Sequence, residues 1–184
     1  MSEIPALIAA LAFAAHKHRD QRRKNVAASP YINHPIALAD VLANEAGLTD
    51  IVVLCAAILH DTVEDTQTTL PELEQRFGGK IASVVGEVTD DTRLPKARRK
   101  QLQVEHARNL SYEARLVKLA DKICNLRDVA DDPPANWSRE RRTEYFEWAK
   151  RVIDGLRGTH AGLEASFDAV YDRGLALQDD PVDN

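Results

Sequence analysis

The sequence predicts an all-α fold, arranged as a single compact helical bundle. Apolar residues recur at the spacing of an α-helix in segment after segment, as with Ile4, Leu7, Ile8 and Leu11. Residues that commonly cap helices precede these segments, and glycine or proline often follows them. No segment shows the alternation of a β-strand over a useful length. We therefore expect one domain over residues 1–177 and an acidic, flexible C-terminal tail at 178–184.

Start and stop signals divide the first half of the chain into helices. Pro35 suits the first turn of the second helix, and Gly47 lies just past its end. Thr49 or Asp50 can cap the third helix, and Thr69 opens a capping-box pattern with a proline in the first turn. The helices expected in this half cover residues 3–20, 35–45, 51–61, 70–77 and 81–89.

The second half is divided in the same way. Asp90, Asp91 and Pro95 interrupt the helical pattern, while Ser111 and Ser138 are suitable N-caps. The helices expected here cover residues 97–110, 113–130, 139–157 and 160–176.

Composition and charge exclude several classes of protein. The formal net charge is −5, whereas proteins that bind duplex nucleic acid are usually basic. No apolar run is long enough to span a membrane, and the N-terminus lacks the basic segment of a signal peptide. Cys55 and Cys124 lie within apolar helical patterns, which indicates buried thiols in a reducing compartment. We expect a cytoplasmic protein with neither nucleic-acid nor membrane partners, and the sequence leaves protein partners open.

The segment from His60 to Asp65 places one imidazole and three carboxylates directly after an apolar helix. Burying such groups unpaired costs roughly several kcal/mol each, so something must compensate for their charge. Positions i and i+4 share one face of a helix, which puts His60 beside Glu64 and Asp61 beside Asp65. A metal ion held in one cleft by these groups is the obvious candidate.

His34 and Asp121 are two further candidate ligands. His34 stands at the start of a helix, and Asp121 is surrounded by apolar residues. Each alone has a simpler interpretation, because His34 suits a helix start and Asp121 can pair with a neighbouring lysine. A single cation would explain these two placements together with those of His60 and Asp61. Two histidines and two aspartates suit Mn²⁺ or Fe²⁺, and Zn²⁺ is an alternative that no thiolate pattern favours.

The order of these residues, and the motifs around them, resemble the hydrolase domain of the RelA/SpoT alarmone enzymes in the HD superfamily of metal-dependent phosphohydrolases. The motifs are Pro30-Tyr31-Ile32-Asn33-His34-Pro35, His60-Asp61-Thr62-Val63-Glu64-Asp65-Thr66, Val88-Thr89-Asp90-Asp91 and Lys118-Leu119-Ala120-Asp121-Lys122-Ile123-Cys124-Asn125-Leu126-Arg127. The resemblance runs from about residue 10 to 175. With Tyr145-Phe146-Glu147-Trp148-Ala149, it is greatest to the small stand-alone members, the metazoan SpoT homologues and bacterial small alarmone hydrolases.

The resemblance implies an HD-domain bundle that removes the 3′-pyrophosphate from ppGpp and pppGpp with one Mn²⁺ per site. The family's metal ligands match His34, His60, Asp61 and Asp121. Its catalytic pair, which orients or deprotonates the attacking water, matches Glu64 and Asp65. Its nucleotide-pocket positions match Arg23, Lys24 and Asn125, with weaker correspondences near the phosphates at Lys96, Arg141 and Tyr145.

Three alternatives remain open beside this interpretation. Related enzymes prefer adenine alarmones such as ppApp, or remove the 2′-phosphate of NADPH. A non-catalytic alarmone sensor is disfavoured, because such a protein is expected to lose ligands or the acidic pair. A single metal is favoured because Glu64 replaces the lysine of many two-metal relatives. Of the other histidines, His16 is expected to be structural and His18, His106 and His160 to lie on the surface.

Overall fold

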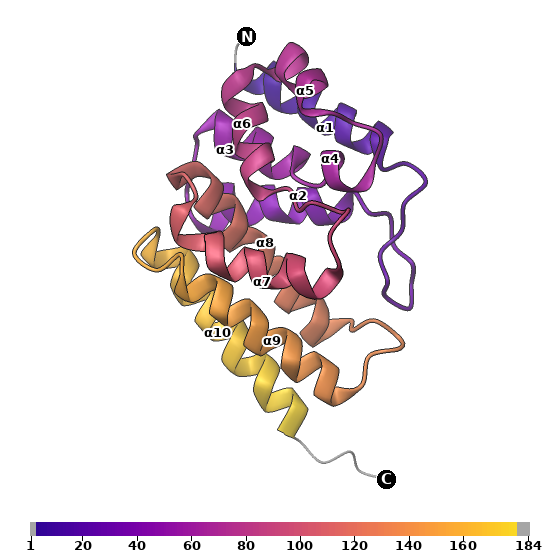
Figure 1. The fold of residues 1–184 in the computed structure, drawn as a ribbon, viewed down its shortest axis with the longest axis vertical. Helices are drawn as coiled ribbons and strands as arrows, with labels where there is room; N and C mark the ends of the chain where they lie inside the picture. The colour runs from indigo at the N-terminus through magenta and orange to yellow at the C-terminus, as the bar shows by residue number, and fades with distance from the viewer. Residues whose placement is uncertain (1–2, 180–184) are drawn as a thin grey trace.

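The computed structural model describes residues 3–179, and within this range the regular elements are helices, confirming the all-α class (Figure 1). An isolated bridge joins Arg22 to Pro30. The elements are α1 (Glu3–Lys17), α2 (Asn33–Asp40), the π-helical turn η1 (Val41–Glu45), α3 (Ile51–Leu59), α4 (Thr62–Asp65), α5 (Leu70–Phe77), α6 (Gly79–Val88), α7 (Lys96–His106), the 3₁₀ turn η2 (Ala107–Asn109), α8 (Tyr112–Asp131), α9 (Arg139–Asp154) and α10 (Ala161–Asp179).

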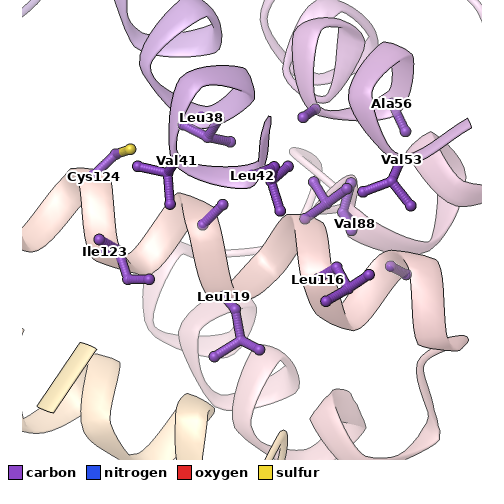
Figure 2. Close-up of a cluster of buried hydrophobic side chains, with 14 of the residues drawn as sticks. Leu38, Val41, Leu42, Val53, Ala56, Val88, Leu116, Leu119, Ile123 and Cys124 are labelled. Atoms are coloured by element: carbon purple, nitrogen blue, oxygen red, sulfur yellow. The ribbon is translucent and has the colours of Figure 1, made fainter. Parts of the chain in front are cut away.

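Helix α8 is the centre of the bundle and packs against elements from both halves of the chain. Figure 2 shows side chains of α2, η1, α3 and α6 gathered against α8, including Leu38, Leu42 and Val53. Leu116 and Leu119 of α8 are almost completely buried. Each such leucine stabilises the fold by roughly 1.5–3 kcal/mol. This packing fixes the position of every side chain that α8 directs into the site described below.

Helices α9 and α10 run side by side at the C-terminal end of the bundle (Figure 1). Gly174 of α10 lies directly against the ring of Phe146 in α9. A Cβ atom at Gly174 would come within 2.0 Å of Phe146 Cε1. The absence of a side chain at this position therefore allows the two helices to approach closely.

The expected helix caps are present. Asp50, Thr69, Ser111 and Ser138 each accept a hydrogen bond from a backbone N–H in the first turn that follows them. Asp50, rather than Thr49, caps α3. These four interactions satisfy backbone donors that have no partner within the helix.

Several helix boundaries differ from those expected. Helix α1 ends at Lys17, and a π-helical turn replaces the last turn of the second expected helix. Helix α10 continues to Asp179, and Gln178 is buried with its amide donating to the carbonyl of Gly174. The rest of the expected tail, residues 180–184, lies outside the described residues. No helix among residues 3–179 is long and apolar enough to cross a membrane.

Candidate metal centre and nucleotide cavity

The apolar helix α3 ends immediately before the candidate ligands His60 and Asp61. Asp61 has φ −95° and ψ −3°, and a new helix, α4, begins at Thr62. The fully buried hydroxyl of Thr62 donates to the carbonyl of Leu59 at 2.7 Å, which stabilises the break. His60 and Asp61 converge here, with Nε2 and Oδ2 only 2.9 Å apart. The chain therefore interrupts its helix at the point where two polar side chains meet.

Three of the candidate ligands form a tight group. One ligand atom each from His34, His60 and Asp121 lies within 4.8 Å of the others, and all three residues are buried. Asp121 Oδ1 is 3.4 Å from His34 Nε2 and 4.0 Å from His60 Nε2. Asp61 joins this group through its contact with His60. The start of α2, the end of α3 and the middle of α8 thus meet at one point.

The donor set fits a divalent cation. Nδ1 of His60 lies 2.8 Å from the carbonyl oxygen of Ala57, so it carries the proton and donates to it. Nε2 of His60 is buried, and the polar atom beside it, Asp61 Oδ2 at 2.9 Å, does not form a hydrogen bond of normal geometry with it. A histidine that binds a metal through one ring nitrogen commonly donates the N–H of its other nitrogen to a backbone carbonyl, which orients the ring. An imidazole held toward two carboxylates offers the nitrogen and oxygen donors that first-row divalent metals bind.

The electrostatics keep both aspartates ionised. Burial alone would raise the pKa of Asp121, but Lys122 at 2.8 Å and the nearby His34 hold it well below its ordinary value. Burial likewise opposes ionisation of Asp61, and His60 overcomes it and lowers its pKa. Tyr31 donates its hydroxyl to Asp61. An ionised Asp121 that is buried, next to a half-buried and ionised Asp61, favours a cation at this point.

Glu64 and Asp65 of α4 face different neighbours. The backbone N–H of Asp90 donates to Glu64 Oε2 at 3.0 Å, and Arg99 Nη1 donates to Oε1 at 3.1 Å. Burial raises the pKa of Glu64 to about 7; the Asp90 N–H acts in the other direction, and nearby carboxylates add to the increase. Asp65 instead accepts a hydrogen bond of 2.7 Å from Gln21. The i, i+4 spacing predicts that His60 and Glu64 share one continuous helical face, but the helix is interrupted between Leu59 and Thr62.

A cavity of about 560 Å³ opens beside His34 and Asp65. The loop after α1 lines one side, and the C-terminal half of α8 with the loop that follows it lines the other; both loops lie on the same side of the bundle in Figure 1. The expected nucleotide-binding residues in its lining are Arg23, Lys24, Lys96, Asn125 and Tyr145. Arg141 is not a lining residue. Its guanidinium carbon lies 4.6 Å from the ring centroid of Trp137, and Trp137 lines the cavity.

Cations gather at the side of the cavity formed by α7. Burial lowers the pKa of Lys96, and the neighbouring charges of Arg141 and Lys24 lower it further. Lys100, one turn after Lys96, has its pKa lowered to about 8 by burial and by Lys96 and Lys122. Mutually repelling cations beside one cavity favour a ligand with several negative charges.

Sequence reasoning missed several residues of the site. Tyr31 belongs to the motif that runs from Pro30 to Pro35, yet its hydrogen bond to Asp61 depends on the tertiary fold. Asp128 forms an ion pair with Arg23 inside the cavity and follows Asp121 by two helical turns, a spacing that signals a shared face. Trp137 comes from a loop and gives no comparable signal. The Arg99 contact joins positions far apart in the sequence and could not be predicted from spacing.

Two of the remaining histidines are placed differently from the expectation. His18, expected on the surface, is 2% exposed and contacts Tyr31 with ring centroids 4.9 Å apart and ring planes tilted by 35°. His16, expected to be structural, is exposed. His18 Nδ1 lies 2.6 Å from the side chain of Gln21, which also binds Asp65. His16 therefore faces solvent, whereas His18, in the turn after α1, is buried. Through Gln21, His18 is connected to Asp65 of the site.

An all-α bundle with this donor set, beside a cavity that four basic residues help to line, is the architecture of a metal-dependent phosphohydrolase. Residues 10–150 match the family described as HD domain. The guanosine-3′,5′-bis(diphosphate) 3′-pyrophosphohydrolase MESH1 of Mus musculus is 56% identical over 96% of this chain and 99% of its own length. The bifunctional (p)ppGpp synthase/hydrolase SpoT of Escherichia coli is 32% identical over 92% of this chain and 25% of its own length.

A solved structure agrees with these relationships. It is described as "A metazoan ortholog of SpoT hydrolyzes ppGpp and plays a role in starvation responses" and is 48% identical. It superposes with a TM-score of 0.89 over 91% of this chain and 94% of its own. The chain belongs to the HD-domain family and, within it, to the hydrolases of RelA/SpoT type.

Proposed function

We propose that this hydrolase removes the 3′-pyrophosphate from guanosine-3′,5′-bis(diphosphate), ppGpp, and from pppGpp, with one Mn²⁺ per site. The observation that carries the proposal is the buried set of His34, His60 and Asp121 next to a cavity of about 560 Å³ whose lining includes Arg22, Arg23, Lys24 and Lys96. The names of the MESH1 and SpoT relatives support this substrate.

The cation would be held by His34, His60, Asp61 and Asp121. Their nitrogen and carboxylate donors suit Mn²⁺, and the described residues place no cysteine among them. When bound, the cation polarises a phosphoryl oxygen and lowers the pKa of water. Lys122 Nζ donates to Asp121 Oδ2 at 2.8 Å and Asn125 Nδ2 donates to Oδ1 at 2.5 Å, so the carboxylate is oriented while each oxygen can still accept a further interaction.

Glu64 is the group that we assign as general base. Burial raises its pKa to about 7 without a cation, and a general base is most effective when its pKa is brought toward the operating pH in this way. The water oxygen forms a bond to the phosphorus on the 3′-oxygen as the bond between that phosphorus and the 3′-oxygen breaks. The proton taken from water balances the charge of the leaving 3′-oxygen, so the products from ppGpp are GDP and pyrophosphate. Asp65, which lines the cavity, serves the leaving-group side.

The cavity lining suggests how the nucleotide is held. Arg23 and Lys24 would contact the guanine base of the nucleotide. Asn125, one turn beyond Asp121 on α8, would contact the sugar or its phosphate. Lys96 and Tyr145 line the side where cations gather and bind the remaining phosphates. Arg141, which lies over the ring of Trp137, does not line the cavity. Its positive charge acts on Lys96 and would attract the phosphates of the nucleotide.

Cys55 and Cys124 are both free and buried. Free thiols are typical of reducing compartments, and we propose the cytoplasm as the place of action.

Product analysis tests the activity. Purified protein is incubated in parallel with ppGpp, ppApp and NADPH, with Mn²⁺, after chelation, and after Mn²⁺ is restored. We expect GDP and pyrophosphate from ppGpp, loss of both products on chelation and recovery with Mn²⁺. Orthophosphate from NADPH without pyrophosphate from either alarmone would overturn the proposal. Binding of ppGpp without turnover in any metal condition would instead identify a sensor.

A further inference from the structure

One buried histidine takes no part in the chemistry proposed above. His18 is 2% exposed, and its Nε2 has no hydrogen-bond partner among the described residues. The other ring nitrogen, Nδ1, lies 2.6 Å from Oε1 of Gln21. Burying a polar ring costs free energy unless its nitrogens are hydrogen-bonded, so the contact with Gln21 is the polar interaction that compensates for the burial of His18.

Gln21 joins His18 to Asp65 through the two ends of its amide. Its Nε2 donates to Asp65 Oδ2 at 2.7 Å, while Oε1 faces His18 Nδ1 at 2.6 Å. Reversing the amide would place its oxygen against the carboxylate, and neither of these two groups can donate a hydrogen bond. Nδ1 of His18 therefore carries the proton and donates to Oε1. The proton on a buried histidine thus decides which end of the Gln21 amide faces the site.

The backbone of Gln21 is held independently of its side chain. The N–H of Gln21 donates to the carbonyl of His18 at 2.9 Å, and its own carbonyl accepts the N–H of Tyr31 at 3.1 Å. These two bonds fix the point from which the side chain starts, but they do not fix the direction in which the amide turns. That direction depends on the hydrogen bond from the His18 ring.

Asp65 is the acidic residue of the site that most needs such support. Glu64 is held through both of its oxygens, whereas Asp65 is exposed and its side chain has one hydrogen bond to a described residue, the bond from Gln21. Asp65 and Gln21 line the nucleotide cavity and also an adjoining open groove beside Lys17 and Arg19. An exposed side chain with space in two directions populates several rotamers. The Gln21 amide therefore selects the rotamer in which Asp65 is found.

We infer that His18 is a positioning residue that acts through Gln21 to hold the carboxylate of Asp65 in place, an inference that rests on the proposed function. Without the donor at position 18 the amide is free to turn, and Asp65 reaches the leaving-group side in a smaller fraction of molecules. The rate then falls, because a misplaced catalytic group slows the reaction even when the substrate still binds. His34, His60, Asp61 and Asp121 keep their positions, so the affinity for Mn²⁺ is retained.

A structural role for His18 through Tyr31 predicts a different result. The two rings are in contact, with centroids 4.9 Å apart, and the hydroxyl of Tyr31 donates to Asp61. If His18 served to support Tyr31, its removal would loosen Asp61 and weaken the binding of Mn²⁺, and the identity of residue 21 would not matter. Mn²⁺ affinity measured beside kcat therefore separates the two roles.

The test measures kcat and KM for ppGpp at saturating Mn²⁺, and Mn²⁺ affinity by calorimetric titration. The variants are Gln21→Met, which keeps the length of the side chain but donates nothing, His18→Leu and His18→Asn. We expect Gln21→Met and His18→Leu each to lower kcat roughly 10-fold, with a smaller change in KM and Mn²⁺ affinity nearly kept. In His18→Asn the side-chain N–H lies close to the former position of Nδ1, so most of the rate should be recovered.

A double variant shows whether His18 acts through Gln21. Once residue 21 is methionine, His18→Leu has no amide left to release, so the double variant should have the kcat of Gln21→Met alone. Independent effects would instead multiply, because mutations at uncoupled sites are additive in free energy. His16 is the matched control, since it is exposed two residues earlier in the chain, and His16→Asn should behave as wild type.

Three outcomes overturn the inference. Multiplied losses in the double variant show that His18 acts on the rate by another route. Weakened Mn²⁺ binding in His18→Leu, with a wild-type kcat once Mn²⁺ is saturating, assigns His18 to the support of Tyr31. A wild-type kcat in Gln21→Met removes the amide from catalysis, and this variant is informative even if His18→Leu does not fold, because Gln21 is only partly buried. Failure of the proposed function is distinguishable, because the wild type itself would then release no pyrophosphate.

Discussion

Arg99 donates a hydrogen bond of 3.1 Å to Glu64 and so connects the first turn of α7 with α4. The other oxygen of Glu64 accepts from the backbone N–H of Asp90 at 3.0 Å, and Gln103 binds the side chain of Asp90 at 2.7 Å. Glu64 is therefore held through both oxygens by groups that belong to none of the metal-binding segments. Its position relative to the attacking water depends on α7 as much as on α4.

Arg99→Gln should reduce kcat roughly 10- to 100-fold, because small displacements of a catalytic group have effects of this size. KM and Mn²⁺ affinity should change little, since Arg99 is not a cavity-lining residue of the nucleotide site. Steady-state kinetics and calorimetric titration with Mn²⁺ measure these quantities, and Arg99→Lys should recover part of the loss. Arg98→Gln is the matched control, because Arg98 pairs with Glu105 on an exposed surface. A wild-type kcat in Arg99→Gln would show that Glu64 is held well enough by Asp90.

Glu64→Gln and His60→Ala should separate catalysis from metal binding. Glu64→Gln keeps the shape of the side chain and removes its basicity, so kcat should fall roughly 10²-fold or more while Mn²⁺ affinity is nearly kept. His60→Ala removes a donor of the buried group and should lose the metal itself. Titration with Mn²⁺ beside rate measurements distinguishes the two. Loss of metal in Glu64→Gln comparable to that in His60→Ala would make Glu64 a ligand.

Activity should fall as the pH drops through the pKa of Glu64. The raised value of about 7 belongs to the metal-free protein, and a nearby cation favours the ionised form and lowers it. Glu64 acts as a base when ionised, so the acid limb of the kcat–pH profile should lie at or below about 7. The limb should disappear in Glu64→Gln. An identical limb in that variant would assign the ionisation to another group.

Gly174→Ala should destabilise the fold even though alanine favours helices. The new methyl group would overlap the Phe146 ring, and overpacking of this kind costs about 1–3 kcal/mol. Gly162→Ala, near the start of the same helix, is the control; its Cβ would lie 3.3 Å from the ring of His160, whose Nδ1 accepts the N–H of Leu163. A shift of that ring by a few tenths of an ångström offsets part of the helix-propensity gain of at most about 1 kcal/mol, so the net change should be far smaller than in Gly174→Ala. Urea unfolding of both variants gives the comparison, and equal stabilities would show that α9 and α10 can move apart without cost.

Local signals predicted the helices well because caps act over a few residues. Asp50, Thr69, Ser111 and Ser138 each lie at the helix start that their side chains indicate. The interruption after Leu59 was harder to predict, because the apolar pattern before it continues without a breaker into polar residues that suit a helix. The break is stabilised by Thr62 and by the meeting of polar side chains, which are tertiary effects.

The site was predictable where chemistry and spacing agree. His34, His60 and Asp121 are polar residues in apolar or helix-start positions, and the structure brings them together. Long-range partners such as Arg99 and Asp128 were not, since their contacts depend on how α7 and the loop after α1 pack. Roles of the individual site residues remain predictions that the experiments above test.

The donor set also has a consequence in time. His34, His60 and Asp61 leave the ribosome well before Asp121, since synthesis proceeds from the N-terminus. Until α8 has formed and packed, the nascent chain presents an incomplete set of donors. Affinity for first-row metals follows a general order, so availability at the moment of loading strongly influences which ion is bound. A cation that requires all four donors would therefore be bound only after α8 has packed against the helices that precede it.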